Sequence, residues 1–198
     1  MRTGSFADLV EAVKACRACG QMRGVRKVLG AQNGSLNATV LFLAEAPGRL
    51  GADRTGVPLF GDKAGHNFRS LLRSTGLSGS QIFITNAVLC NPRDQLGNNR
   101  RPTSEEVRNC AVYLRELIQI IKPRVIVTLG KTALVSLRLI RNHDIELRRD
   151  VANAMPWDGC TVFPLYHPGA RAMVHRNLSE QMSDYYRLWE YLRDCHVL

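Results

Sequence analysis

The sequence feature that most constrains the fold is a short apolar run, residues 39–44, that leads directly into a loop rich in proline and glycine. The loop continues to residue 65 and carries the carboxylates Glu45, Asp53 and Asp62. A short apolar run of this kind is typical of a strand that is buried on both faces of a parallel sheet. In open α/β sheets, ligands bind just beyond the carboxyl ends of the strands. The stretch therefore predicts a buried strand followed by a binding loop.

Three later apolar runs repeat this pattern at residues 82–88, 124–129 and 161–165. Apolar residues also recur at helical spacing in residues 6–15, 66–74, 103–121, 132–139 and 178–192. The third of these helices has a clear start, because Glu106 follows Thr103 by three residues, as in a capping box. The alternation predicts an α/β fold, a three-layer α/β/α sandwich with a central, roughly four-stranded parallel sheet. Residues 141–157 show mixed charge and no period, so we expect them to be irregular.

The length of the chain predicts a single domain, residues 1–198, with a core of its own. No apolar run approaches the roughly 20 residues needed to span a bilayer, and the first residues lack the apolar segment of a signal peptide. We therefore expect a cytoplasmic protein, a monomer that binds no membrane. The formal net charge of +10 favours a polyanionic partner, nucleic acid above all. A basic surface that only keeps the protein in solution remains the other interpretation.

Six cysteines in a chain without a secretion signal argue against a disulfide framework. Cys16 and Cys19 form a C-x-x-C pair, and Cys90 and Cys110 follow far along the chain. The alternative to disulfides is that these cysteines ligate a metal ion or a cluster. Cys110 also falls on the apolar stripe of its helix, a pattern that by itself is more typical of a core cysteine. The two other cysteines are expected to be plain buried thiols: Cys160 and Cys195.

Polar residues lie at or near the ends of three predicted strands: Glu45, Asn86 and His167. Asp62 joins them from the loop after the first strand. Each residue alone has an ordinary structural interpretation, since asparagine and aspartate form turns and a histidine is often part of a structural hydrogen-bond network. The fold rule that sends strand ends to one edge of the sheet is what predicts a common site.

Several separated motifs resemble the iron–sulfur members of the uracil-DNA glycosylase superfamily, its families four and five. EAPG at residues 45–48 is similar to the first motif of family four, and residues 51–56 with 61–62 are more similar to family five, which has Asn at the place of Asp53. Residues 84–88, Cys90, residues 101–106 and Cys110 resemble both families. His167-Pro168 matches the second motif, although Gly169 replaces its Ser. The resemblance covers residues 16 to about 177.

The resemblance implies a monofunctional DNA glycosylase that hydrolyses the N-glycosidic bond of uracil in DNA and initiates base excision repair. Uracil cannot be reached inside a duplex, so the nucleotide has to be flipped out. Cleavage develops positive charge on the sugar, and a nearby carboxylate can stabilise this charge and orient water. Asp62 stands at the place of the catalytic aspartate of family five. Glu45 is the second candidate for that role and is expected to shape the uracil pocket.

The leaving uracil needs hydrogen-bond donors at O2, and the resemblance implies His167 as such a donor. The amide of Asn86 can pair with N3–H and O4, which distinguishes uracil from cytosine. Backbone N–H groups around Glu45 and Ala46 are expected to complete the pocket. The families stack a Phe on the base directly after the proline that aligns with Pro58, whereas this chain has Leu59 there and then Phe60. Phe60 is therefore our candidate for stacking, with packing within the loop as the other interpretation.

The loop that follows residues 167–168 is implied to probe the DNA minor groove, with Arg171 and Met173 as candidates for a wedge or a phosphate contact. A solvated basic loop is the competing interpretation. Phosphate contacts to single- or double-stranded DNA, with a steep salt dependence, are expected from five further arginines: Arg49, Arg54, Arg100, Arg101 and Arg176.

Four cysteines match the ligand order of the family's [4Fe–4S] cluster, for which four thiolates are the usual set: Cys16, Cys19, Cys90 and Cys110. We expect this cluster to be structural, because the implied reaction is a hydrolysis and needs no electron transfer. Spacing alone also allows Zn²⁺.

Two other functions remain open at this point. One is a uracil-DNA binding protein with little or no turnover, but the relatives that trap the base carry a histidine before the helix at residue 103, and residues 98–101 here read NNRR. The other is a glycosylase with broader specificity for deaminated bases such as hypoxanthine or xanthine.

Overall fold

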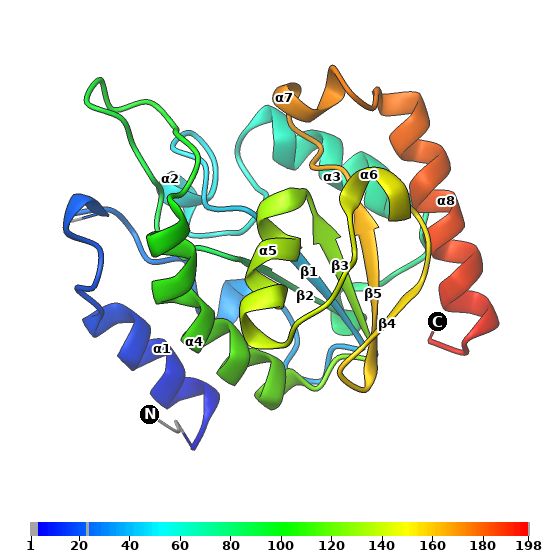
Figure 1. The fold of residues 1–198 in the computed structure, drawn as a ribbon, viewed down its shortest axis with the longest axis horizontal. Coiled ribbons are helices and arrows are strands. Elements are labelled where there is room, and N and C mark those ends of the chain that lie inside the picture. Colours follow the sequence, from blue (N-terminus) through cyan, green and yellow to red (C-terminus); the bar gives the residue numbers. More distant parts are fainter. Residues whose placement is uncertain (1–3, 23, 198) are drawn as a thin grey trace.

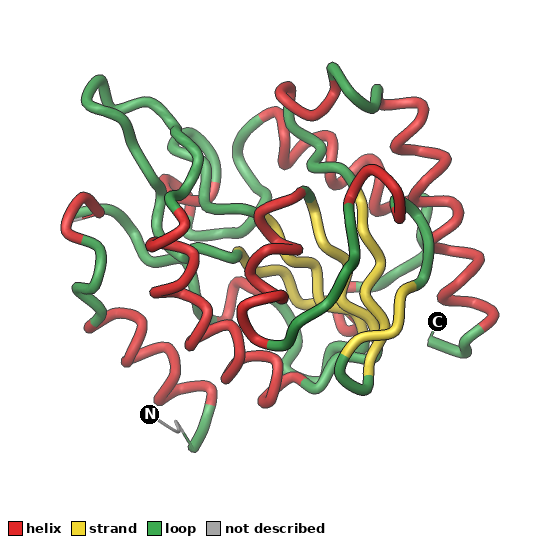
Figure 2. Tube along the Cα trace, viewed as in Figure 1, coloured by secondary structure: helices red, strands yellow, loops and turns green. Residues whose placement is uncertain are grey.

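The structure is a computed structural model that describes residues 4–22 and 24–197, and it shows helices on both sides of a central sheet (Figures 1 and 2). Within these residues the sheet has five strands in the order β2-β1-β3-β5-β4. The four parallel strands are β1 (Val40–Ala44), β2 (Ile82–Asn86), β3 (Val125–Leu129) and β5 (Cys160–Leu165). The predicted three-layer sandwich is confirmed.

The fifth strand, β4 (Met155–Trp157), was not predicted, and it pairs with β5 in antiparallel fashion at the edge of the sheet. The expectation of an irregular segment at residues 141–157 was therefore wrong, since this segment also contains α6 (Leu147–Asp150). Asp158 and Gly159 connect the two strands with φ values of 45° and 81°. An Asp-Gly pair with two positive φ angles is the favoured two-residue hairpin turn. Pro156 at the middle of the strand is tolerated because it stands on an edge.

Successive residues of the buried strands point to opposite faces of the sheet, and each face has its own core. Leu41 and Leu43 of β1 pack toward α1 (Phe6–Ala15), α4 (Ser104–Ile121) and α5 (Lys131–Ile140). Val40, Phe42 and Ala44 pack on the other side, where α3 (Lys63–Arg73) and α8 (Leu178–Asp194) lie. Because both faces are covered, every residue of β1 and β3 is buried, which explains the continuous apolar runs in the sequence.

The helix ends are largely set by side-chain caps. The predicted capping box of α4 is confirmed: Thr103 Oγ1 accepts the Glu106 N–H at 3.2 Å, and Glu106 Oε2 accepts the Thr103 N–H at 2.8 Å. Helix α3 begins at Lys63, three residues before the predicted start, because Asp62 serves as its N-cap. Two further short helices follow strand ends, α2 (Ala52–Thr55) and α7 (Ala170–Met173).

Three turns of 3₁₀ helix complete the described part of the chain, at Gly20–Met22, Ala31–Asn33 and Gly79–Gln81. Among the described residues, no helix combines the length and the apolar character that crossing a membrane requires.

Candidate functional site

The carboxyl ends of the parallel strands bring the predicted polar residues to one edge of the sheet. Ala44 and Asn86 are in register, so Glu45 begins its loop beside the end of β2. Gly130 follows β3 directly, and His167 lies two residues beyond the end of β5. In the strand order, Asn86 and the end of β5 are three interstrand spacings apart, roughly 14 Å at about 4.8 Å each. We call the site formed here by Glu45, Asn86, Thr132 and His167 the strand-end site.

Asn86 provides one end of the strand-end site. Its side chain is buried, with 3% exposed, yet its amide nitrogen Nδ2 has no hydrogen-bond partner in the part of the chain that the structure describes. A buried donor without a partner costs roughly 1–3 kcal/mol, so native proteins retain one mainly where a ligand or water satisfies it. Asn86 is thus suited to donate a hydrogen bond to a bound group.

His167 provides the other end, and its ring is held in a defined tautomer. The Gly169 N–H donates to His167 Nδ1 at 3.0 Å, so a neutral imidazole carries its proton on Nε2. Burial lowers the pKa of His167, although the carboxylates of Glu45 and Asp62 oppose this shift. The ring is therefore neutral at pH 7 and offers Nε2–H as a donor. A Cβ on residue 169 would lie 2.8 Å from Nδ1, which explains why glycine suits this position.

Glu45 is oriented by a residue that the sequence analysis missed. Thr132 Oγ1, in the first turn of α5, donates to Glu45 Oε2 at 2.6 Å. Because Thr132 follows β3 by only a few residues, this hydrogen bond makes the end of β3 part of the strand-end site. The signal in the sequence was a hydroxyl residue within a few positions of the end of a buried strand, as for the other site residues.

Asp62 is held by one hydrogen bond and by the close approach of two glycines. Its Oδ1 accepts the Gly65 N–H at 2.8 Å and so caps α3. A Cβ on Gly48 or Gly51 would lie 2.9 Å or 2.4 Å from Asp62 Oδ2, so these two glycines leave room for the carboxylate. One oxygen is therefore anchored while the other faces the loop after β1, close enough to His167 to influence its pKa.

The ring of Phe60 is the exposed aromatic group of this loop, with 45% of its surface accessible. The neighbouring Leu59 adopts a left-handed backbone conformation with φ 48° and packs against the core that α3 and α8 share. The guanidinium carbon of Arg69 lies 4.7 Å from the centre of the Phe60 ring, a cation–π contact that restrains it. The one-residue offset from the family pattern thus leaves Phe60, not Leu59, available for stacking.

The arginines that were expected to contact phosphate divide into two groups. Arg100 pairs with Glu106 at 2.6 Å and Arg176 pairs with Asp184 at 2.5 Å, and both carboxylates are buried. Breaking such pairs would leave a buried charge without its partner, so these two arginines serve the fold and not phosphate binding. The exposed ones are Arg49, Arg54, Arg101 and Arg171, while Met173 is half-buried.

Apart from the strand-end site, the structure has a cavity of about 860 Å³. We call it the cysteine cavity, because it is lined by Cys16, Cys19, Cys90 and Cys110. The pKa of Cys90 is raised to about 11 and that of Cys110 to about 12, mainly by burial and in smaller part by the neighbouring thiols. Lys27 acts in the opposite direction on Cys90. Asn109 Nδ2 donates to Cys19 Sγ at 3.5 Å. The four thiols therefore surround one space, although they are distant in sequence.

These thiols do not form a compact site for one ion. Among the described residues, no group of three or more His, Cys, Asp or Glu side chains could hold a single metal ion. A tetrahedral Zn²⁺ with Zn–S bonds of about 2.3 Å draws its sulfurs to roughly 3.8 Å from each other. In the described residues the four thiols line one cavity without converging on a single point. Cys160 and Cys195 are half-buried and lie outside this cavity.

An open, mainly parallel sheet with helices on both faces, and with an amide, a carboxylate and an imidazole at its strand ends, defines a doubly wound α/β protein with a polar candidate site. Comparison of the sequence with profiles of known families identifies the family within this class. The profile of the uracil DNA glycosylase superfamily matches residues 31–193, and the chain belongs to this superfamily.

Individual relatives agree with this membership. The chain is 35% identical to a type-4 uracil-DNA glycosylase of Thermotoga maritima over 174 residues, which cover 87% of this chain and 84% of the relative. It is 32% identical to the type-4 enzyme of Archaeoglobus fulgidus, with 94% and 92% covered. A type-5 uracil-DNA glycosylase of Pyrobaculum aerophilum is 33% identical, with 68% and 63% covered. The resemblance to families four and five is thereby confirmed.

Proposed function

We propose that this chain is a uracil-DNA glycosylase that hydrolyses the bond between uracil and deoxyribose in DNA and so initiates base excision repair. The observation that carries the proposal is the buried Nδ2 of Asn86, a donor with no partner among the described residues, at the end of the strand beside Glu45. In this proposal Asn86 Nδ2 donates to uracil O4 and the Asn86 side-chain carbonyl accepts from N3–H. The bound base thereby supplies the partner that the buried Nδ2 lacks within the described part of the chain. Cytosine presents the reverse pattern and would be rejected.

The reaction breaks the C1′–N1 bond, and its electron pair leaves with uracil as negative charge spread over the base. His167 Nε2–H donates to O2, where the charge develops, and a single donor of this kind contributes about 3 kcal/mol. The neutral ring is kept in the required tautomer by the Gly169 N–H. Water forms the new bond to C1′ and gives its proton to a carboxylate.

Asp62 is our candidate for the carboxylate that orients the water and stabilises the positive sugar. Its capping bond to Gly65 fixes one oxygen and leaves the other free to accept from water. Glu45 is held by Thr132 and, with the backbone of Ala46, shapes the pocket. Phe60 stacks on the extruded base, with Arg69 supporting its ring from one side.

We expect DNA contacts from the exposed residues Arg54, Arg101 and Arg171, and from Met173 in the short helix α7, which would enter the minor groove. The formal net charge of +10 supports a substrate of either single- or double-stranded DNA. A monomer located in the cytoplasm stays a prediction.

The cysteine cavity fits a [4Fe–4S] cluster held by Cys16, Cys19, Cys90 and Cys110. Such a cluster would tie the end of α1, the loop after β2 and the interior of α4 to one another, and it supplies no step of the hydrolysis. Chemical analysis of the purified protein tests this: iron and sulfide with a brown colour support the cluster, and stoichiometric zinc in a colourless protein contradicts it.

The deciding experiment for the function is a cleavage assay with oligonucleotides that contain one uracil, hypoxanthine or xanthine, in single and double strands. We expect alkali-sensitive sites at uracil that disappear in Asp62→Ala. Cleavage at the purines as well would establish the broader specificity. Tight binding of uracil-DNA without any abasic product would show that the binding protein without turnover is the correct function.

A further inference from the structure

The loop between β2 and α4 contains a small hairpin that projects beside α2 (Figure 1). Arg93 and Asn99 form an isolated antiparallel bridge at its base, and the turn lies between them. No role has been assigned to this hairpin so far, although Asn99 at its base and Asn91 just before it join the hairpin to other loops near the strand-end site. We refer to Asn91 and Asn99 as the asparagine brace.

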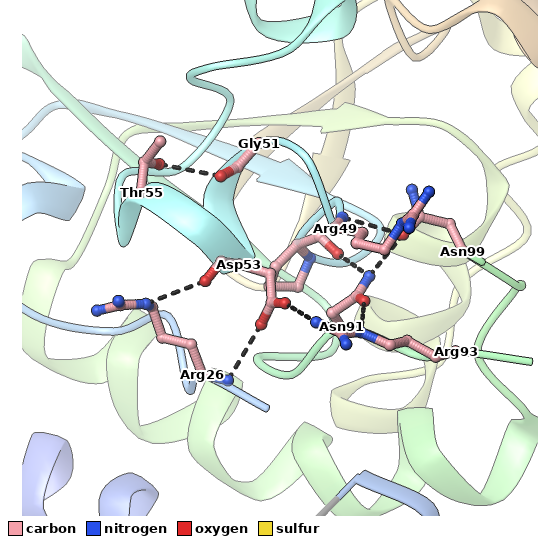
Figure 3. Close-up of polar contacts among 9 residues, drawn as sticks. Arg26, Arg49, Gly51, Asp53, Thr55, Asn91, Arg93 and Asn99 are labelled. Carbon is pink, nitrogen blue, oxygen red and sulfur yellow. Dashed lines mark hydrogen bonds and ion pairs between the residues drawn. The ribbon is translucent and has the colours of Figure 1, made fainter. Parts of the chain in front are cut away.

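Asn91 is the inner residue of the asparagine brace, with only 1% of its surface exposed. Its Nδ2 donates to the backbone oxygen of Pro47 at 2.6 Å and to Asn99 Oδ1 at 2.9 Å, and its Oδ1 accepts from Arg93 Nε at 2.8 Å. Both polar atoms of a buried amide are thus used by three different partners. Asn91 fixes the loop after β1 relative to the hairpin (Figure 3).

Asn99 is the outer residue, and it joins three segments. Its Oδ1 accepts the backbone N–H of Arg49 at 2.9 Å as well as the bond from Asn91. Its backbone oxygen accepts from Arg171 Nη2 at 2.9 Å, in the first turn of α7. The hairpin, the loop after β1 and the segment after β5 are therefore connected through one residue.

The inner end of the brace is anchored beside the cysteine cavity. Arg93 forms an ion pair with Asp53, which is 8% exposed and lines that cavity. Asp53 Oδ1 also accepts the backbone N–H of Arg26 at 3.0 Å, and its backbone oxygen accepts from Arg26 Nε at 3.0 Å. Figure 3 shows this continuous path from Arg26 through Asp53 to Asn91 and Asn99.

We propose that Asn91 and Asn99 are positioning residues that hold the loop after β1 and the start of α7 at a fixed separation. This rests on the proposed function, because those two segments carry the groups that we expect on the base and on the DNA. Arg49 and Leu50 are exposed, so packing alone does not hold this loop. A misplacement of about 1 Å at a reacting centre can cost roughly 100-fold in rate.

The test compares Asn99→Ala with Asn98→Ala in single-turnover cleavage of a uracil oligonucleotide. Asn99 is exposed, so its truncation leaves the core intact, and Asn98 is an exposed neighbour whose side chain makes one contact of 3.5 Å. We expect the cleavage rate of Asn99→Ala to fall about 30-fold, with binding of uracil-free DNA, melting temperature and visible absorption unchanged. Asn98→Ala should stay within about twofold of the parent.

Two outcomes overturn the proposal: equal cleavage by Asn99→Ala and the parent, or a loss that lies entirely in DNA affinity. If Asn99→Ala does not fold, Asn99→Gln keeps the amide but displaces it by one methylene, and it should lower the rate about tenfold or more. Parent-like cleavage by that variant also overturns the proposal. A parent protein that cleaves no uracil at all would instead contradict the proposed function.

Discussion

The strand-end site and the cysteine cavity come within four residues of each other on the chain, at Asn86 and Cys90, but they are built by different means. The first stands on strands whose register is fixed, since Asn86 pairs with Ala44 at the end of the sheet. The second is formed by the segment after α1, a loop and a helix, around a small apolar cluster that includes Met22, Val88 and Val107. The sheet therefore holds the first site in shape, whereas the second, in the described part of the chain, has no strand to hold it and, under the proposed function, would depend on the cluster.

The largest effect should come from the cysteine cavity. Cys90→Ser is expected to abolish the visible absorption and to destabilise the protein by about 3 kcal/mol, which lowers the melting temperature by roughly 10 °C. The reason is that the proposed cluster would link three segments that otherwise meet around only a small apolar cluster. Thermal unfolding and iron content measure the effect.

The matched control is Cys160→Ser, because Cys160 is a half-buried thiol outside the cavity. It should keep the visible absorption of the parent. If Cys90→Ser also keeps its colour and melting temperature, the cysteine cavity holds nothing, and the contrast between the two regions is wrong.

The next largest effect should come from His167 and should lower the cleavage rate without lowering stability. His167→Asn removes the donor at O2 and is expected to slow single-turnover cleavage about 100-fold or more, with little change in melting temperature. His196→Asn provides the same substitution near the C-terminus, where the φ of 52° suits asparagine. A melting temperature that falls as far as in Cys90→Ser would show that the strand-end site is not held by the sheet alone.

A smaller effect is expected from Thr132→Val, which keeps the shape of the side chain but removes the 2.6 Å bond to Glu45. Loss of one positioning hydrogen bond to a carboxylate is worth about 1.5–3 kcal/mol. Part of this is recovered by water, so we expect roughly a tenfold slower cleavage with unchanged DNA affinity. A rate equal to that of the parent would remove β3 from the strand-end site.

The smallest effect concerns pH. Burial holds the folded-state pKa of His167 below its ordinary value of 6.5, so the unfolded chain takes up the proton more readily than the folded one. The stability from the neutral ring is complete above pH 6.5 and is lost as the pH falls through the folded pKa. Between pH 8 and pH 5, about the range where histidine titrates, the parent should lose stability relative to His167→Asn in urea unfolding. A constant difference between the two would contradict the buried, neutral ring.

Much of this comparison could be predicted from the sequence. The strand ends were predicted because strands buried on both faces give continuous apolar runs, and a polar residue at the end of such a run stands out. The spacing of Cys16 and Cys19 also stood out, because a C-x-x-C pair in a chain without a secretion signal indicates metal or cluster ligation. The edge strand β4 was missed because three residues with a central Pro156 give no periodic signal, although Asp158-Gly159 was a turn signal.

The contacts that complete the site could not be predicted. Asn91 meets the backbone of Pro47 across 44 positions of sequence, and Asn99 meets Arg49 across 50. Such bonds depend on how loops pack, and no local pattern encodes them. The same reason explains why Arg100 and Arg176 were expected on phosphate, since their buried partners Glu106 and Asp184 become apparent only in the fold.

The central claim is that Asn86 and His167 hold the two ends of one uracil. A crystal structure of the protein with uracil, or with DNA after cleavage, tests it most directly. The account predicts Asn86 Nδ2 at about 3 Å from O4 and His167 Nε2 at about 3 Å from O2. Uracil bound elsewhere, or a bound uracil that leaves Asn86 Nδ2 without a partner, would contradict it.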